Sequence, residues 1–97
     1  MSCEVRLDPH AEAEILSSLA WYSSRSDLAA RSFVHELMRV IARAVDSPER
    51  SPKYLHGARR IVFPRFPFSL VYRMKGEVLE VLAVAHQSRK PGYWKGR

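Results

Sequence analysis

The chain has a single cysteine and no long apolar run, and both scarcities narrow the classes of protein it can belong to. Cys3 has no second thiol with which to form a disulfide, a redox pair or a metal knuckle, which fits a reducing compartment. No segment approaches the roughly 18 apolar residues of a membrane span. The N-terminus carries Glu4, Arg6 and Asp8 where a signal peptide needs an apolar stretch. We therefore expect a cytoplasmic protein without membrane contact.

Glycine and histidine are also sparse. The glycines are too far apart for a phosphate-binding loop, so nucleotide hydrolysis has no support. They are Gly57, Gly76, Gly92 and Gly96. The histidines outside the last strand are scattered without metal-ligand spacing. They are His10, His35 and His56. We expect neither a cofactor nor a metal.

The length of 97 residues suits one domain and excludes two. Hydrophobic residues make up 46% of the chain and charged residues 27%, close to the average of globular proteins. A core of this size is marginal, and a partner that binds only the folded state would stabilise it. The composition is therefore consistent with a single domain, residues 1–97, that depends on a partner.

The net charge of +6 is unevenly spread. Through Ser47, five arginines face seven acids, a balance of −2; from Pro48 onward, eleven basic residues face three acids, a balance of +8. A positive field of this kind attracts nucleic acid or an acidic protein segment. Charge alone is also consistent with a plain nucleic-acid-binding protein. The same charge distribution is expected if the basic residues only keep the surface soluble.

The first half of the chain predicts a short strand and two helices. Residues 4–7 alternate polar and apolar, and Asp8-Pro9 is a favourable helix start. In the first helix, Glu12 and Glu14 can face water. Its apolar positions recur every three or four residues, at Ala11, Ile15, Leu19 and Tyr22. Ser24 and Asp27 have the spacing of a capping box for the second helix.

The second helix is amphipathic and ends before Pro48. Its apolar face comprises Ala30, Phe33, Val34, Leu37, Ile41 and Val45. Mostly outside that face lie Arg31, Glu36, Arg39 and Arg43. Residues 48–57 turn to Pro, Ser, Lys and Glu, which predicts a long exposed connection.

The second half predicts three strands. Residues 58–63 and 68–73 are β-branched and aromatic runs joined by a compact turn, and Lys75-Gly76 supplies a hairpin turn. Residues 78–85 are apolar at nearly every position, so this strand should be central and covered on both faces. The result is an α+β domain of two layers, β-α-α-β-β-β, with a helical hairpin on one face of a mostly antiparallel sheet. Residues 87–97 form a basic, aromatic tail or surface loop.

Trp21 and Tyr22 are expected to pack in the core or within the helical hairpin, because large aromatic side chains dominate core burial. By the same reasoning, Phe63, Phe66 and Phe68 are expected in the core.

Several stretches together resemble the ParE/RelE toxin superfamily. They are Ala20-Trp21-Tyr22, Arg59-Arg60-Ile61, the run from Phe66 to Tyr72, and the run from Val81 to His86 leading to Arg89-Lys90-Pro91-Gly92-Tyr93-Trp94. The resemblance spans nearly the whole chain and implies a plasmid-stabilisation toxin neutralised by a cognate, ParD-like antitoxin. The antitoxin segment should be amphipathic, with acids against the basic sheet side and apolar residues against the helical hairpin.

The superfamily has two branches with different targets, a ribosome-dependent mRNA endoribonuclease like RelE and an inhibitor of DNA gyrase like ParE. In the RelE-like pattern, Arg60 matches a basic position and Tyr93 the C-terminal tyrosine. Val62, Ser69 and Gln87 stand where three further cations are expected, and their loss removes most of a phosphate clamp. The resemblance therefore favours the ParE-like branch, in which inhibition comes from binding rather than catalysis, with the endoribonuclease as the alternative.

The candidate site residues follow from these two readings. An endoribonuclease would use Arg60, His86, Arg89 and Tyr93, although a strand-end histidine is more often a structural hydrogen-bonding group. A binding inhibitor would contact its target through Arg60, Arg73, Arg89, Tyr93 and Trp94. Arg59 and Arg60 lie on opposite faces of a regular strand, so only one can enter a shared site. One of the two tail aromatics is expected to pack against the sheet instead.

Overall fold

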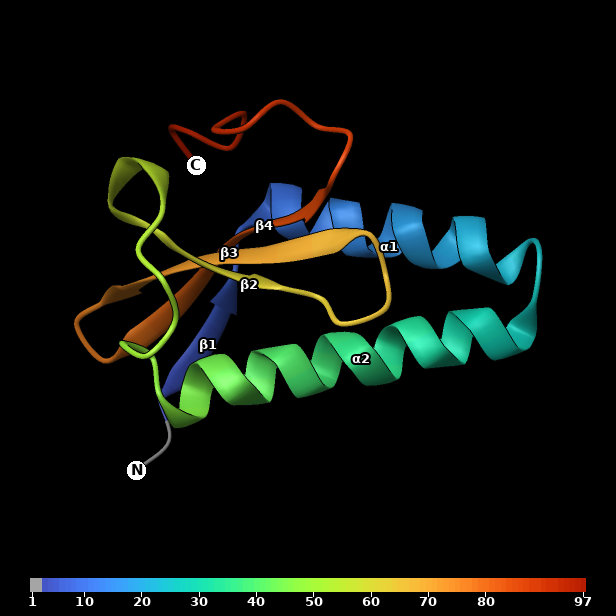
Figure 1. Ribbon diagram of the computed structural model, residues 1–97, viewed down its shortest axis with the longest axis horizontal. Coiled ribbons are helices and arrows are strands. Elements are labelled where there is room, and N and C mark those ends of the chain that lie inside the picture. The colour runs from blue at the N-terminus through green and yellow to red at the C-terminus, as the bar shows by residue number, and fades with distance from the viewer. Residues whose placement is uncertain (1–2) are drawn as a thin grey trace.

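Two helices cover one face of a four-stranded sheet in the computed structural model, which describes residues 3–97 (Figure 1). The elements are β1 (Glu4–Leu7), α1 (Pro9–Ser23), α2 (Asp27–Asp46), β2 (Arg59–Val62), β3 (Phe68–Lys75) and β4 (Val78–His86), with a short 3₁₀ turn at Leu55–Gly57. The sheet order is β1-β4-β3-β2. The last three strands are antiparallel, and β1 joins β4 as a parallel edge. The predicted β-α-α-β-β-β, two-layer fold is confirmed.

The helices begin at local capping groups, one of which differs from the prediction. The Asp8 carboxylate accepts the His10 N–H at 2.8 Å at the start of α1, followed by proline. The cap of α2 is Ser26, whose hydroxyl accepts the Ala29 N–H at 3.2 Å. The predicted cap at Ser24 is wrong, because this residue ends α1 and its hydroxyl donates to the Trp21 carbonyl at 2.7 Å.

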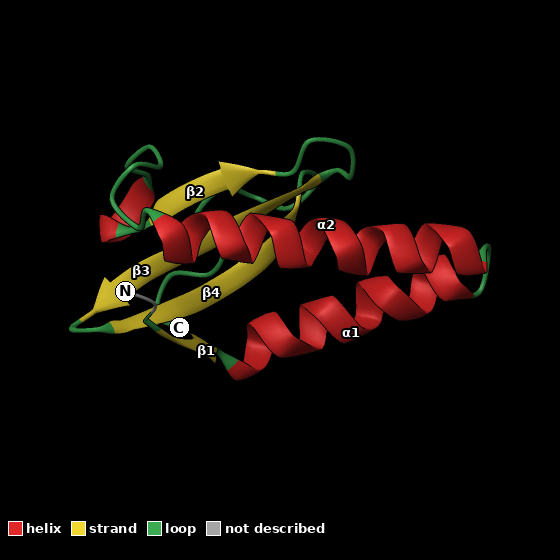
Figure 2. Ribbon diagram, turned by 90° about the horizontal axis from the view of Figure 1, so that it is seen from below, coloured by secondary structure: helices red, strands yellow, loops and turns green. Residues whose placement is uncertain are grey.

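The main core lies between the helices and the sheet, the two layers that Figure 2 shows from below. Phe33 of α2 is fully buried and packs against the rings of Tyr22, Phe66 and Phe68 at centroid distances of 5.3 to 5.6 Å. Tyr72 is also fully buried, and its hydroxyl donates to the Pro48 carbonyl at 2.7 Å. This bond ties the end of α2 to the sheet.

A smaller core lies on the other face of the sheet, where the C-terminal segment folds back. It comprises Ala58, Val71, Leu82, Ala83 and Trp94. Residues 79 and 81–84 are therefore buried whichever face they lie on, which confirms that β4 is a central strand covered on both sides. The segment predicted as a tail or surface loop is a packed turn region at its Trp94 end.

Trp21 packs at the helical hairpin and not in the core, because it is 53% exposed and its ring centroid lies 5.1 Å from that of Tyr22. Two predictions about burial on α2 are wrong. Val34 of the predicted apolar face is 38% exposed. Glu36, expected outside, is 9% exposed, and its carboxylate accepts the backbone N–H groups of Arg65 and Phe66 at 2.9 and 3.0 Å. The turn between β2 and β3 leaves these two amides without strand partners, so a buried carboxylate is stabilised there.

Neither described helix carries an apolar stretch long enough to cross a lipid bilayer.

Candidate functional site

Three of the four residues that an endoribonuclease would use lie around one pocket of about 360 Å³ at the start of the C-terminal segment. His86 comes from the end of β4, and Arg89 and Tyr93 from the segment that follows. Arg60 is not among the residues that line this pocket. It lines a different one, of about 340 Å³, with the loop after α2. The four candidate catalytic residues are therefore divided between two separate pockets.

The hydroxyl of Tyr93 is held by a carboxylate. It donates to Oε2 of Glu14 on α1 at 2.6 Å. Burial raises the pKa of Tyr93 above its usual range, and the hydrogen bond and negative charge of Glu14 raise it further. Ionised tyrosine is thus unavailable near neutral pH, and the phenolic proton points at Glu14. In this arrangement Tyr93 anchors the C-terminal segment.

Glu14 is the residue that sequence reasoning missed, because it was expected to face water. Its side chain is only 16% exposed. Besides Tyr93, it accepts the Val84 N–H at 3.1 Å and Nη1 of Arg97 at 3.0 Å. The same Arg97 nitrogen donates to the Leu82 carbonyl at 3.1 Å. The pairing of β1 with β4 ends at Val81. Beyond it, the Glu14 carboxylate and the Arg97 guanidinium bond to the β4 backbone at Val84 and Leu82, where a neighbouring strand would otherwise do so.

His86 is engaged locally at the end of β4. Its Nδ1 accepts the Ser88 backbone N–H at 3.0 Å and lies 2.8 Å from the Ser88 hydroxyl oxygen. Because a backbone N–H can only donate, the proton of the neutral ring lies on Nε2. The ring edge packs on Phe68 at a centroid distance of 5.2 Å. With its free lone pair used, His86 is not placed as a general base in this arrangement.

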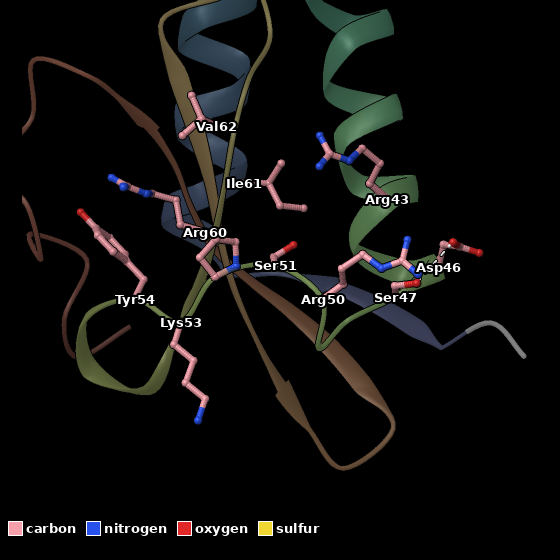
Figure 3. A pocket seen from close by; sticks show the side chains of 11 residues that line it. Arg43, Asp46, Ser47, Arg50, Ser51, Lys53, Tyr54, Arg60, Ile61 and Val62 are labelled. Carbon is pink, nitrogen blue, oxygen red and sulfur yellow. Dashed lines mark hydrogen bonds between the residues drawn. The ribbon is translucent and has the colours of Figure 1, made fainter.

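Arg60 belongs to a basic pocket between the end of α2 and β2 (Figure 3). Its guanidinium stacks over the Tyr54 ring at 4.2 Å, while Arg59, on the opposite face, donates to the Ser51 carbonyl at 2.7 Å. In Figure 3, Arg43 and Arg60 lie on either side of Ile61, and Arg60 turns towards Tyr54. The pocket therefore contains cations from both α2 and β2, but the guanidinium groups of Arg43 and Arg60 do not point towards one another.

Two of the residues proposed to contact a target instead make contacts within the fold. Trp94 is 3% exposed in the outer core and packs against Tyr54, with ring centroids 6.0 Å apart, so it has no face to offer a target. Nε of Arg73 donates to Oε1 of Glu80 on the neighbouring strand at 2.8 Å. Only Arg60, Arg89 and Tyr93 of the five contact residues therefore remain for a target surface. The guanidinium of Arg89 lies over the Tyr93 ring at 3.9 Å.

Two of the positions that lack an expected cation are neighbours in the sheet. Val62 of β2 pairs directly with Ser69 of β3. Val62 is 60% exposed, so a basic residue there would be free to meet a phosphate. Gln87 follows β4, and its N–H donates to the Pro67 carbonyl at 2.9 Å. An uncharged valine and serine side by side leave a gap where a phosphate clamp would concentrate its charge.

The fold and site define an α+β domain of the RelE/ParE-like class. The sequence matches the family model described as ParE toxin of type II toxin-antitoxin system, parDE, over residues 5–91. The chain belongs to this family and is a toxin of a type II toxin–antitoxin system. No curated protein sequence is significantly similar to it.

Solved structures show the same fold at low sequence identity. A chain of the chromosomal ParDE system from P. aeruginosa has a TM-score of 0.75 and 18% identity, covering 88% of this chain and 96% of that one. A double mutant of the E. coli toxin RelE in its free state has a TM-score of 0.61 and 17% identity, covering 91% and 86%. At these identities the similarity concerns the fold alone.

Proposed function

We propose that this toxin acts in the cytoplasm by binding DNA gyrase and that a cognate, ParD-like antitoxin neutralises it. Family membership supports an antitoxin partner. The gyrase target rests on one observation above all, the locked Tyr93 hydroxyl beside Glu14. A site that acted by proton transfer would need this group free, whereas a binding surface needs it rigid.

The remaining target residues suit a binding role. Arg89 and Tyr93 form a stacked cation and aromatic pair near the end of β4, and such residue types are enriched among the energetically dominant contacts of protein interfaces. Arg60 adds a second cationic contact from β2.

A supercoiling assay with purified gyrase and toxin tests the proposal. We expect loss of supercoiling or accumulation of cleaved DNA complexes, reversed by the co-purified antitoxin. An Arg89→Gln, Tyr93→Phe double variant should inhibit more weakly than wild type, with Lys75→Gln as the control, since Lys75 is exposed at the far end of β3. Unchanged supercoiling at saturating wild-type toxin would refute the gyrase target.

The alternative is a ribosome-dependent mRNA endoribonuclease, and one observation favours it: His86, Arg89 and Tyr93 do share a pocket. Primer extension on translated mRNA would then reveal new 5′ ends that disappear in Tyr93→Phe and His86→Ala variants. Intact transcripts in the presence of active wild-type toxin would eliminate this function.

A further inference from the structure

Two pockets adjoin between α1 and the end of β4. The first, of about 360 Å³, is the one lined by Arg89 and Tyr93. The second, of about 400 Å³, is lined by Trp21 and by Pro67 of the turn before β3. Four residues line both pockets, which therefore share a wall: Ser17, Ser18, Phe68 and His86. We refer to the two pockets together as the α1 groove.

One face of α1 forms a wall of the α1 groove along most of the helix. The lining positions recur every three or four residues, so they lie on the same side of the helix. They are His10, Ala13, Glu14, Ser17, Ser18 and Trp21. At 1.5 Å per residue, this wall is about 16 Å long. A groove of that length accommodates a short segment of a partner chain.

Trp21 is an exposed but rigid aromatic group at one end of the groove. The guanidinium of Arg25 lies 3.7 Å from the centroid of its ring, and Nη1 of Arg25 donates to the Trp21 carbonyl at 3.2 Å. The Tyr22 ring meets the indole edge-on. A side chain that is already held in place loses little conformational entropy on binding, and tryptophan is enriched among the dominant contacts of protein interfaces.

The polar groups of the groove are hydrogen-bond donors. Arg25 borders the Trp21 end and Arg89 lines the other end, and neither is in an ion pair within residues 3–97. His86 lies on the shared wall, and its hydrogen bonds within residues 3–97 use Nδ1, so the Nε2–H is available as a donor. The groove therefore combines an apolar centre with a cation at each end.

We propose that the α1 groove receives a segment of the toxin's protein target in which a large apolar side chain lies between two carboxylates. The apolar side chain packs against Trp21 and Pro67, and the carboxylates pair with Arg25 and Arg89. The groove is continuous with Arg89 and Tyr93, which the proposed function already assigns to the target. The identity of the target as gyrase rests on that function, whereas the chemistry of the bound segment rests on the groove.

Two other occupants fit less well. An RNA strand carries a phosphate at every nucleotide and needs a row of cations. Arg97 in the groove is neutralised by Glu14 at 3.0 Å, and Gln87 beside His86 is uncharged. A second copy of this chain has a net charge of +6, so its approach is electrostatically unfavourable.

Four single variants of the full-length toxin test the proposal. Trp21→Ala removes the aromatic contact, and Ser17→Trp fills the groove from an exposed position. Leu16→Ala is the control for the first, because it removes an exposed apolar side chain of α1 that lines neither pocket. Ser23→Trp is the control for the second, because it adds the same ring at an exposed position of α1 outside the groove. Circular dichroism verifies that all four variants fold.

Two assays measure target engagement. Inhibition of supercoiling by purified gyrase reports on the proposed target, and growth arrest after induction without antitoxin reports on any target. We expect Trp21→Ala and Ser17→Trp to need at least tenfold more toxin for half-maximal inhibition and to lose growth arrest, because each removes a central contact. Both controls should change the inhibitory concentration less than threefold.

Several results would overturn the proposal. Groove variants that inhibit and arrest growth as well as their controls would show that no target enters the groove. Fully toxic groove variants that the antitoxin no longer neutralises would assign the groove to the antitoxin. Translation-dependent mRNA cleavage lost in the groove variants would assign it to RNA, and a wild-type dimer that Ser17→Trp dissociates would assign it to a second copy.

The two assays separate this proposal from the gyrase target. Growth arrest that depends on the groove, without gyrase inhibition or mRNA cleavage, would reject gyrase and keep the groove. Gyrase inhibition that the groove variants retain would do the reverse. A wild-type toxin that neither inhibits gyrase nor arrests growth would overturn both.

Discussion

Replacing Glu14 with alanine should destabilise the toxin far more than a surface acid normally would. The substitution removes the acceptor of three donors: the Val84 N–H, the Tyr93 hydroxyl and the Arg97 guanidinium. Each buried donor left without an acceptor costs about 1 to 3 kcal/mol. Release of the C-terminal segment lets Tyr93 and Arg97 regain water and offsets part of this. We expect a net loss of about 3 kcal/mol.

Urea unfolding followed by far-ultraviolet circular dichroism measures this loss. For a domain of about 100 residues, 3 kcal/mol corresponds to a fall in Tm of roughly 15 °C. Limited trypsin digestion adds a local readout, because cleavage after Arg89 and Lys95 should accelerate once the segment is released.

Glu12→Ala is the matched control, since Glu12 lies two positions earlier on the same helix and is exposed. Its loss should cost about 0.3 to 1 kcal/mol, the usual effect of an acid in the first turn. Equal destabilisation by the two variants would show that the Glu14 contacts do not hold the C-terminal segment.

Three further predictions test the fold and the site. Glu36→Ala should lower the free energy of unfolding by about 2 kcal/mol in urea titrations, because it leaves the part-buried backbone N–H groups of Arg65 and Phe66 without an acceptor, and a loss within 0.5 kcal/mol, the usual effect of a surface substitution, would contradict this role. Trp94→Ala should cost about 3 to 5 kcal/mol by the same measurement, whereas Trp21→Ala, at a half-exposed position, should cost less than half as much; similar losses would mean that the C-terminal segment is not docked. Because the pKa of Tyr93 is raised in the folded state, the unfolded chain loses this proton first above pH 10, so stability should fall as pH rises beyond that point. Tyr93→Phe should flatten this alkaline fall, and an unchanged slope would reject the assignment.

The regular elements could be predicted because their signals are local. Asp8-Pro9 and the apolar spacing of α2 act over one or two helical turns, and the turn at Gly76, which adopts a positive φ of 64°, needs a residue without a Cβ. The resemblance to toxins depended on several such stretches in order. The misplaced helix cap, at Ser24 instead of Ser26, is an error of two residues within an otherwise correct hairpin.

The site was less predictable, because its decisive contacts join residues far apart in the chain. Glu14 meets Tyr93 and Arg97 across about eighty positions, and nothing in the helical pattern around it separates it from Glu12. A weak signal was available, since Glu14 lies beside Ile15 at the edge of the apolar stripe. The division of Arg60 from His86, Arg89 and Tyr93 could be seen only when the sheet was assembled.

The sequence by itself determined the class of the fold, the order of its elements and the family. Hydrophobic periodicity and turn residues act over short distances, so they can be identified without knowing which residues are in contact in the folded protein. Only the tertiary structure decided which polar groups are buried together. Glu14 and Glu36 are ordinary helix acids in the sequence, and they become structural because the ends of β4 and the turn before β3 leave backbone amides without strand partners. The need to satisfy those buried amides is created by the assembled sheet, so it has no local signature in the chain.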